Sequence, residues 1–310
     1  MQPMIARPVI AHPLPPLPEL DALQDHLPPA RSLWADARRR FLRNRAASSG
    51  LLLLVLVLLA CLIGPAFSPF PFDEPDFGLM QAAPDAVSGH WFGTDYIGRD
   101  LLVRTLLGGR VSLLVGALGA LVAVVLGTLY GATAGYAGGR TDSAMMRALE
   151  VLGSFPVVFL VILLMTFFGR SLWLIFVAIG AVSWLDVARI VRGQTLALRR
   201  REFIDAAIVG GVSPARIVLR HIVPNVLGLV IVYATLLVPQ MILFESFLSY
   251  LGLGVQEPMT SWGALLEQGA KSLENAPWEL LFPAGFLVAT LFAFGFVGDG
   301  LRDALDPRGR

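Results

Sequence analysis

Long apolar stretches constrain this chain more than any other feature of its sequence. Each is close to the ~20 residues that a helix needs to cross the hydrocarbon core of a bilayer. The six stretches cover residues 49–67, 111–134, 148–168, 171–188, 226–246 and 280–298. Only helices and closed barrels satisfy their backbone polar groups inside a membrane. The pattern therefore predicts an all-α integral membrane protein with six transmembrane helices.

The composition of the whole chain also favours membrane insertion. Hydrophobic residues make up 55% of the 310 residues, charged residues make up 15%, and the mean hydropathy is +0.69. An ordinary soluble domain carries about 25% charged residues, so this chain is not expected to be a soluble enzyme. The net charge of +1 gives no reason to expect a nucleic-acid partner. The single cysteine, Cys61, lies in the first apolar stretch and has no partner for an intrachain disulfide.

Two glutamates lie in these apolar stretches. Glu150 is near one end of the third stretch, and Glu245 is near the outer end of the fifth. Ionisable residues inside a membrane are functional candidates by default, so both are candidates for a translocation path. For Glu150 the alternative is a structural pair with Arg147. Pro156 lies inside the third stretch and Pro239 inside the fifth, where neighbouring helices would have to satisfy the freed backbone groups.

The placement of basic residues predicts the orientation of the chain. With a cytoplasmic N-terminus, 19 of the 24 lysines and arginines would face the cytoplasm. The five on the outer side would be Arg99, Arg104, Arg110, Arg170 and Lys271. The positive-inside rule strongly favours this arrangement. Both termini and the loop at about 189–225 would then be cytoplasmic.

The N-terminal region contains two segments of different composition. Residues 1–30 are proline-rich and lack the apolar core of a signal peptide, which predicts a disordered cytoplasmic leader. Residues 31–48 place six arginines among apolar side chains such as Trp34 and Phe41, which predicts an amphipathic segment on an anionic membrane surface. Beyond it we expect the first transmembrane helix plus a periplasmic loop at 49–110, a core with five transmembrane helices at 111–300, and a cytoplasmic tail at 301–310.

The segment 199–225 is the longest charge-bearing segment between two apolar stretches. It predicts two short helices around a turn at Gly210 and Gly211, where a side chain would obstruct the backbone. Pro214 suits the first position of the second helix. We expect that helix to stop at Pro224, because the residue before a proline is pushed out of the α region. Small residues around the turn would let another protein approach closely.

This segment resembles the EAA loop in permease subunits of bacterial ABC importers. The motif reads Glu-Ala-Ala, three residues, Gly, nine residues, Ile-x-Leu-Pro. Its spacing is kept here by Asp205-Ala206-Ala207, Gly211 and His221-Ile222-Val223-Pro224, with Asp for Glu, His for Ile and Val for Leu. The resemblance implies a type I ABC importer permease fold, in which this loop docks into a groove of an ATPase subunit. The residues it assigns to that contact are Glu202, Asp205, Ala206, Ala207, Gly210, Gly211, Arg220, His221 and Pro224. The alternative is an amphipathic linker on the membrane surface.

The first outer loop, about 68–110, contains the run FGTDYIGRDLL, which is similar to a segment of peptide-type permeases. Its Asp and Arg residues either bridge a tight turn or contact a periplasmic binding protein. A metal site built from His90, Asp95 and Asp100 is disfavoured, because a lone histidine lacks the further nitrogen or sulfur donors that zinc sites need.

The second outer loop, about 247–279, contains the runs LGLG and SWG, which also resemble the peptide branch. It predicts a re-entrant or surface helix–turn–helix with Trp262 at the membrane interface. The closing run GDGLRDALDP resembles the C-terminus of the same family. We expect that run near the coupling loop or at a partner subunit, and the alternative is a helix end capped by Asp299.

The chain carries no motif for energy-driven chemistry of its own. It has no GxxxxGK[ST] phosphate loop, and its only lysine, Lys271, falls on the outer side. Neither a serine nucleophile elbow nor an HExxH helix is present. We therefore expect a non-catalytic subunit without cofactor or metal, driven by ATP hydrolysis on partner subunits.

The resemblance covers about residues 31–310 and implies import of oligopeptides from the periplasm across the bacterial inner membrane. The implied partners are a homologous second permease subunit, two ATPase subunits and a periplasmic peptide-binding protein. A sister permease for dipeptides, nickel, glutathione or murein peptides is the alternative. An ATPase-independent secondary carrier is a remote alternative, because carriers typically show inverted repeats and midplane charges, and no clear repeat is present.

Overall fold

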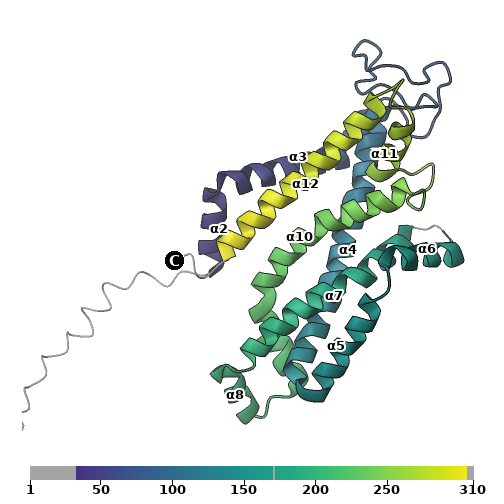
Figure 1. Cartoon of the computed structure of the whole chain (residues 1–310). Coiled ribbons are helices and arrows are strands. Elements are labelled where there is room, and N and C mark those ends of the chain that lie inside the picture. The colour runs from purple at the N-terminus through teal and green to yellow at the C-terminus, as the bar shows by residue number, and fades with distance from the viewer. Residues whose placement is uncertain (1–32, 170–171, 306–310) are drawn as a thin grey trace, which may run out of the picture.

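The computed structural model describes residues 33–169 and 172–305, and this part of the chain is predominantly helical (Figure 1). The all-α prediction is confirmed. The predicted leader, 1–30, and the last five residues of the predicted tail lie outside the described residues. The elements are α2 (Leu33–Arg43), α3 (Arg45–Phe67), α4 (Leu101–Ala137), α5 (Gly139–Gly153), α6 (Val157–Phe168), α7 (Leu172–Leu198), α8 (Glu202–Val209), α9 (Pro214–Ile217), the π-helical turn η1 (Val218–Ile222), α10 (Val223–Tyr250), α11 (Trp262–Lys271) and α12 (Trp278–Leu305).

Several helices are long and apolar enough to cross a membrane. Within the described residues these are α3, α4, the run Pro214–Tyr250 and α12, and the bent pair α5 and α6 makes a fifth candidate if it counts as one span. The fourth predicted stretch, 171–188, falls almost entirely in α7. The chain is thus a multi-pass membrane protein, while the count of six transmembrane helices stays a prediction.

The third apolar stretch is not the single helix that we expected. α5 ends at Gly153, α6 begins at Val157, and the two axes are bent by 75°. Pro156 explains the break, because it has no N–H for a helical hydrogen bond and disfavours the α conformation at the preceding residue. It caps the start of α6 in an extended conformation, with ψ of 112°.

α4 is the central helix and packs along α7, α10 and α3. Its 37 residues span about 55 Å, well beyond the ~30 Å of a hydrocarbon core. Glycines on α4 let α7 lie close against it. A side chain at Gly131 would collide with the carbonyl of Ala188, and one at Gly135 would collide with Thr195. Such small-residue contacts are how membrane helices approach one another closely.

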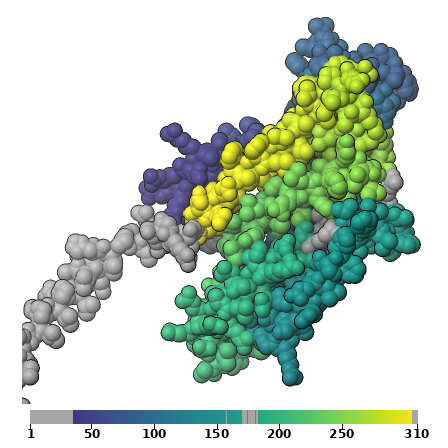
Figure 2. Space-filling view, in the orientation of Figure 1, coloured from purple at the N-terminus to yellow at the C-terminus, as the bar shows by residue number. Residues whose placement is uncertain are grey.

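The helices α2, α3 and α12 form an arm on one side of α10, whereas α5 to α8 lie on its other side (Figure 2). Ala37 and Phe41 of α2 are buried against the end of α12, so this side of the amphipathic segment covers protein rather than lipid. Gly300 of α12 lies against Ala47 of α3 and Phe41.

Two expectations for the C-terminal segment were wrong, namely a place near the coupling loop and a cap at Asp299. Its described part, up to Leu305, packs on α2 and α3, whereas α8 lies apart from it (Figure 1). A place at a partner subunit stays a prediction. Asp299 is not a cap, because α12 continues through it to Leu305.

Candidate functional site

The turn between α8 and α9 is built around Gly211. This residue adopts a positive φ of 74°, a conformation that side chains with a Cβ rarely adopt. The amide of Gly211 donates to the carbonyl of Ile208 at 3.0 Å, and the amide of Val212 donates to that of Ala207 at 3.0 Å. This pair of hydrogen bonds is the Schellman motif that closes many helices. The predicted glycine turn is confirmed.

Three buried isoleucines anchor this helix–turn–helix to the rest of the chain. Ile204, Ile217 and Ile222 are each 0% exposed and belong to the main hydrophobic core. That core also contains Val187 and Val191 of α7, so the segment is fastened to the helix that leads into it. A displacement of the turn would therefore move α7 and α10 with it.

The opposite face of this segment is apolar and exposed. Phe203, Ile208, Val209 and Leu219 are all exposed, and Val209 is 89% exposed at the end of α8. We call these four residues the coupling surface. Exposed charged residues lie along the same segment, namely Arg201, Glu202, Asp205, Arg216 and Arg220. Exposed apolar side chains with charged neighbours are typical of protein–protein contact sites.

The nine residues assigned to the ATPase contact lie along this same segment. Ala207 and His221 are half-buried, and the other seven are exposed. Sequence reasoning singled out the turn and the charges but missed the apolar centre at Phe203, Ile208 and Leu219. Those residues sit next to the motif positions, and only their exposure distinguishes them from core residues.

The helix after the turn does not stop at Pro224, contrary to expectation. α9, η1 and α10 form one continuous run from Pro214 to Tyr250. Within η1 the amide of Val223 donates to the carbonyl of Val218, five residues back, which is the bonding of a π-turn. This wider turn places Pro224 in the first turn of α10, where a missing N–H is tolerated. The side-chain amide of Asn225 donates to the carbonyl of His221 at 2.5 Å.

Two arginines fix the end of α7 to the corner between α4 and α5. Arg192 makes a bidentate pair with Asp142 of α5, with distances of 2.5 and 2.6 Å from Nε and Nη2 to the two carboxylate oxygens. Such pairs hold both partners in a fixed geometry. Arg199 donates to the carbonyl of Ala137 at 3.4 Å and lies over the ring of Tyr136. These contacts thus hold in place the end of α7, from which the segment with the coupling surface continues.

The opposite end of the molecule carries an outer ionic cluster of Asp95, Arg99, Arg104 and Glu257. Arg99 Nε lies 2.7 Å from Asp95 Oδ2, and its Nη2 lies 2.9 Å from Glu257 Oε1. Arg104 Nε lies 3.3 Å from Asp95 Oδ2. The hydrogen bonds from Arg99 hold the pKa of Glu257 below its usual range. The Asp and Arg residues of the FGTDYIGRDLL run therefore bridge the turn, as one of the two alternatives predicted. Glu257 connects these contacts to the second outer loop.

The other two residues considered for a metal site, His90 and Asp100, contact each other. His90 Nδ1 lies 2.9 Å from Asp100 Oδ2, and the His90 ring stacks on Phe70. Asp100 also caps α4, because its Oδ1 accepts from the amide of Val103 at 2.8 Å. These contacts shape the first outer loop around the start of α4.

Trp262 lies in the core and not at the membrane interface, so that expectation was wrong. It is 0% exposed, and its indole N–H donates to the carbonyl of Thr105 at 2.9 Å. Gly109 of α4 provides the space, since a side chain there would contact the indole ring. α11 therefore packs inward against α4 rather than lying on the surface.

Glu245 is enclosed by serines. It is 0% exposed and accepts from Ser249 Oγ at 2.6 Å and from Ser112 Oγ at 3.0 Å. Ser112 Oγ in turn accepts from the amide of Trp262 at 3.1 Å. This burial inside one chain favours a structural role in joining α4, α10 and α11. A place in the translocation path stays a prediction.

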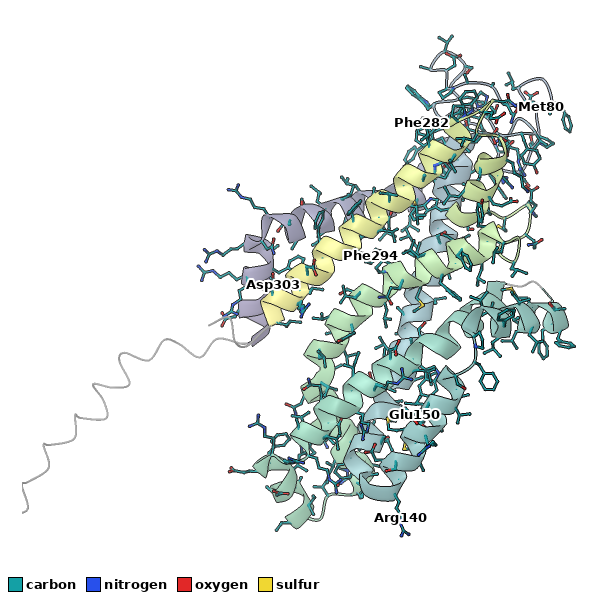
Figure 3. All side chains as sticks on the ribbon, viewed as in Figure 1. Met80, Arg140, Glu150, Phe282, Phe294 and Asp303 are labelled. Carbon is teal, nitrogen blue, oxygen red and sulfur yellow. The ribbon has the colours of Figure 1, made fainter. Side chains whose placement is uncertain are left out.

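Glu150 lies on the surface of α5, where Figure 3 labels it near the end of that helix. Its Oε2 is 3.9 Å from Arg147 Nε, and both side chains are well exposed. Exposed pairs of this kind contribute at most about 1 kcal/mol. This contact supports the alternative that Glu150 forms a structural pair with Arg147. A role for Glu150 in the translocation path stays a prediction.

Comparisons with known proteins agree across nearly the whole chain. Residues 103–310 match the family model of the binding-protein-dependent transport system inner membrane component. Residues 32–84 match the model of the N-terminal TM domain of oligopeptide transport permease C.

The similar proteins include permeases named for oligopeptide transport and one named for dipeptide transport. The oligopeptide transport system permease protein OppC of Escherichia coli K12 is 68% identical over 90% of this chain and 93% of its own length. The OppC protein of Haemophilus influenzae is 59% identical over 94% of this chain and 93% of its own length. The dipeptide transport system permease protein DppC of Bacillus subtilis is 44% identical over 90% of this chain and 87% of its own length.

Proposed function

Because this chain belongs to the family of binding-protein-dependent transport system inner membrane components, we propose that it is the permease subunit of an ATP-driven importer of oligopeptides. It is a non-catalytic membrane subunit. The observation that carries the choice of cargo is its 68% identity to a relative named for oligopeptide transport. The relative named for dipeptides is 44% identical, which makes dipeptides the second candidate.

The proposed partners are a homologous second permease, two ATPase subunits and a periplasmic peptide-binding protein. The coupling surface supports the ATPase contact, because Phe203, Val209 and the residues beside them expose apolar and charged side chains on one short segment. Peptide would pass between the two permeases, and the outer loops would receive it from the binding protein.

We propose that both termini and the coupling surface are cytoplasmic. The count of basic residues supports this orientation. α8 and the loop at 68–100 lie at opposite ends of α4 (Figure 1), so this orientation would place the loop on the periplasmic side. The chain would lie in the bacterial inner membrane.

In this mechanism, closure of the ATPase subunits displaces the coupling surface. The buried isoleucines transmit that displacement to α7 and α10, and the Arg192–Asp142 pair transmits it to α5. The helices then change from an outward-facing to an inward-facing arrangement. The energy comes from ATP binding and hydrolysis on the partners.

A cysteine replacing Val209 should react with a membrane-impermeant maleimide only from the cytoplasmic side. Val209 is 89% exposed, and the matched control Val87 is 97% exposed in the first outer loop. The native Cys61 is buried and adds little background. We expect Val209→Cys to label in inside-out vesicles from cells that lack the ATPase subunits, which would otherwise cover this residue, and Val87→Cys to label in spheroplasts. Labelling of Val209→Cys in intact spheroplasts would contradict the proposed orientation.

A further inference from the structure

Two charged residues of α7, Asp186 and Arg189, lie at membrane depth. Both are within two residues of Ala188, and a side chain at Gly131 of α4 would collide with the carbonyl of Ala188. Gly131 belongs to the apolar stretch 111–134, and it lies three residues, about 4.5 Å, from the end of that stretch. This part of α7 is therefore level with the inner part of a segment that crosses the membrane, and no step of the proposed transport mechanism uses its charges.

Both side chains are uncovered in this chain. The side chain of Asp186 is 75% exposed and that of Arg189 is 46% exposed, and Arg189 Nη1 lies 2.6 Å from Asp186 Oδ1. Their neighbours Leu185 and Ala188 are buried against Leu149 of α5. Ionisable residues at membrane depth face the interior of a helix bundle or a water-filled cavity rather than lipid. We therefore expect this face of α7 to be turned away from the hydrocarbon.

The break between α5 and α6 lies beside this ion pair. Gly153 is the last residue of α5, and a side chain there would come within 3.2 Å of Arg189 Nη2. Ser154, Phe155 and Pro156 form the break, and all three are exposed. Non-helical backbone at membrane depth is tolerated only where it is buried in protein or lines a water-filled cavity. The ion pair and the break are separate observations, and both favour a polar space beside α5 and α7.

The chemistry of the pair suits a moving cargo better than a fixed protein contact. The cores of protein–protein interfaces are depleted in charged residues, whereas Asp186 and Arg189 present one charge of each sign. Among the described residues neither has a second ion-pair partner, and their hydrogen bond uses one of the five guanidinium donors of Arg189. An exposed pair of this kind contributes little stability, so each partner can exchange the other for a charge on a ligand.

We propose that Asp186 and Arg189 line the inner half of the peptide path and bind the charged ends of the cargo. Asp186 accepts hydrogen bonds from the terminal ammonium group, and Arg189 donates hydrogen bonds to the terminal carboxylate. Every unmodified linear peptide carries both groups, so the pair binds peptides without regard to their side chains. This role rests on the proposed function, because it requires peptide as the cargo.

The test is ATP-dependent uptake by the assembled importer in proteoliposomes, with three cargos: a free tripeptide, its N-acetylated form and its C-terminal amide. Each variant's rate is divided by the wild-type rate for the same cargo, which removes the selectivity of the binding protein. Asp186→Asn and Arg189→Gln each remove one charge. The matched controls are Asp303→Asn and Arg43→Gln, which remove exposed charges from the arm of α2, α3 and α12, where Figure 3 labels Asp303.

Asp186→Asn should slow uptake of the free peptide and of the amide about fivefold, the upper end for one ion pair in contact with water. It should leave the relative rate of the acetylated peptide unchanged, because that cargo has no terminal ammonium group. Arg189→Gln should slow the free and acetylated peptides by the same factor and spare the amide, and both controls should match the wild type. Equal slowing of all three cargos would overturn the proposal, since loss of a merely structural pair does not distinguish between them, and so would wild-type rates throughout.

A tripeptide with a benzophenone side chain tests the same path in the unaltered protein. Illuminated during turnover, it should form adducts with residues 150–156 or 183–193, and their absence from both segments would overturn the proposal. This result decides alone if a charge variant fails to assemble or a blocked cargo is not taken up. Wild-type uptake separates the two claims: uptake without these adducts would refute this inference alone, whereas no ATP-dependent uptake would refute the proposed function and this inference with it.

Discussion

Replacing Gly211 with valine should abolish ATP-dependent peptide uptake while leaving membrane insertion intact. Gly211 has a φ of 74°, and no atom lies within 4 Å of where its Cβ would be. The free-energy cost of a side chain at this position therefore comes from the backbone conformation and not from steric crowding. For a β-branched residue this cost is about 1–3 kcal/mol. Valine would open the Schellman turn and displace Val209 and Val212, and with them the coupling surface.

The matched variant is Gly211→Asn, since asparagine tolerates the left-handed conformation better than other side chains. It should keep most of the uptake. The measurement is uptake of a radiolabelled tripeptide in cells, with the amount of inserted protein determined by immunoblot of the membrane fraction. Wild-type uptake by Gly211→Val would contradict the role of this turn.

Replacing Arg99 with alanine should destabilise the outer face of the protein by about 3–5 kcal/mol, the range for breaking a buried ion pair. Arg99 is 2% exposed and contacts both Asp95 and Glu257. Its loss would leave the 1% exposed Asp95 carboxylate with only the poorly aligned Arg104 as a counter-charge. The link between the two outer loops would be weakened at the same time.

Lys271→Ala is the control for this variant, because Lys271 is exposed and its pair with Glu267 lies on one helix. We expect it to change stability by less than about 0.5 kcal/mol. Limited proteolysis from the periplasmic side and the apparent Tm of the purified importer measure both effects. Equal protease resistance of the Arg99→Ala and Lys271→Ala variants would show that the outer ionic cluster has no stabilising role.

The elements that sequence reasoning placed correctly depend on local chemistry. The glycine turn at 210–211 requires only a residue that adopts positive φ, followed by a proline that starts a helix. The apolar stretches predicted the main helices because membrane-spanning segments must satisfy their own backbone.

Two prolines show where local reasoning fails. Pro156 and Pro224 have the same missing N–H, yet the first breaks a helix by 75° and the second lies inside a continuous run. The difference is the π-turn at η1, whose extra residue per turn moves Pro224 to a first-turn position. Packing of the buried Ile217 and Ile222 against the core accompanies that turn, and no local pattern reveals it.

Contacts between distant segments were also beyond sequence reasoning. Glu257 joins the outer ionic cluster although 158 residues separate it from Arg99. From the sequence alone, Trp262 is as compatible with the membrane interface as with the core. Its burial depends on Gly109, which lies in another helix. Such pairings depend on the tertiary arrangement and have no signature in a single sequence.

The most direct test of this account is uptake by proteoliposomes that contain the purified permease pair with or without the two ATPase subunits. With ATP enclosed inside and loaded binding protein outside, the complete assembly should accumulate peptide, and the pair lacking the ATPase subunits should not. Neither a proton nor a sodium gradient should replace ATP. Sustained gradient-driven accumulation without the ATPase subunits would contradict the account.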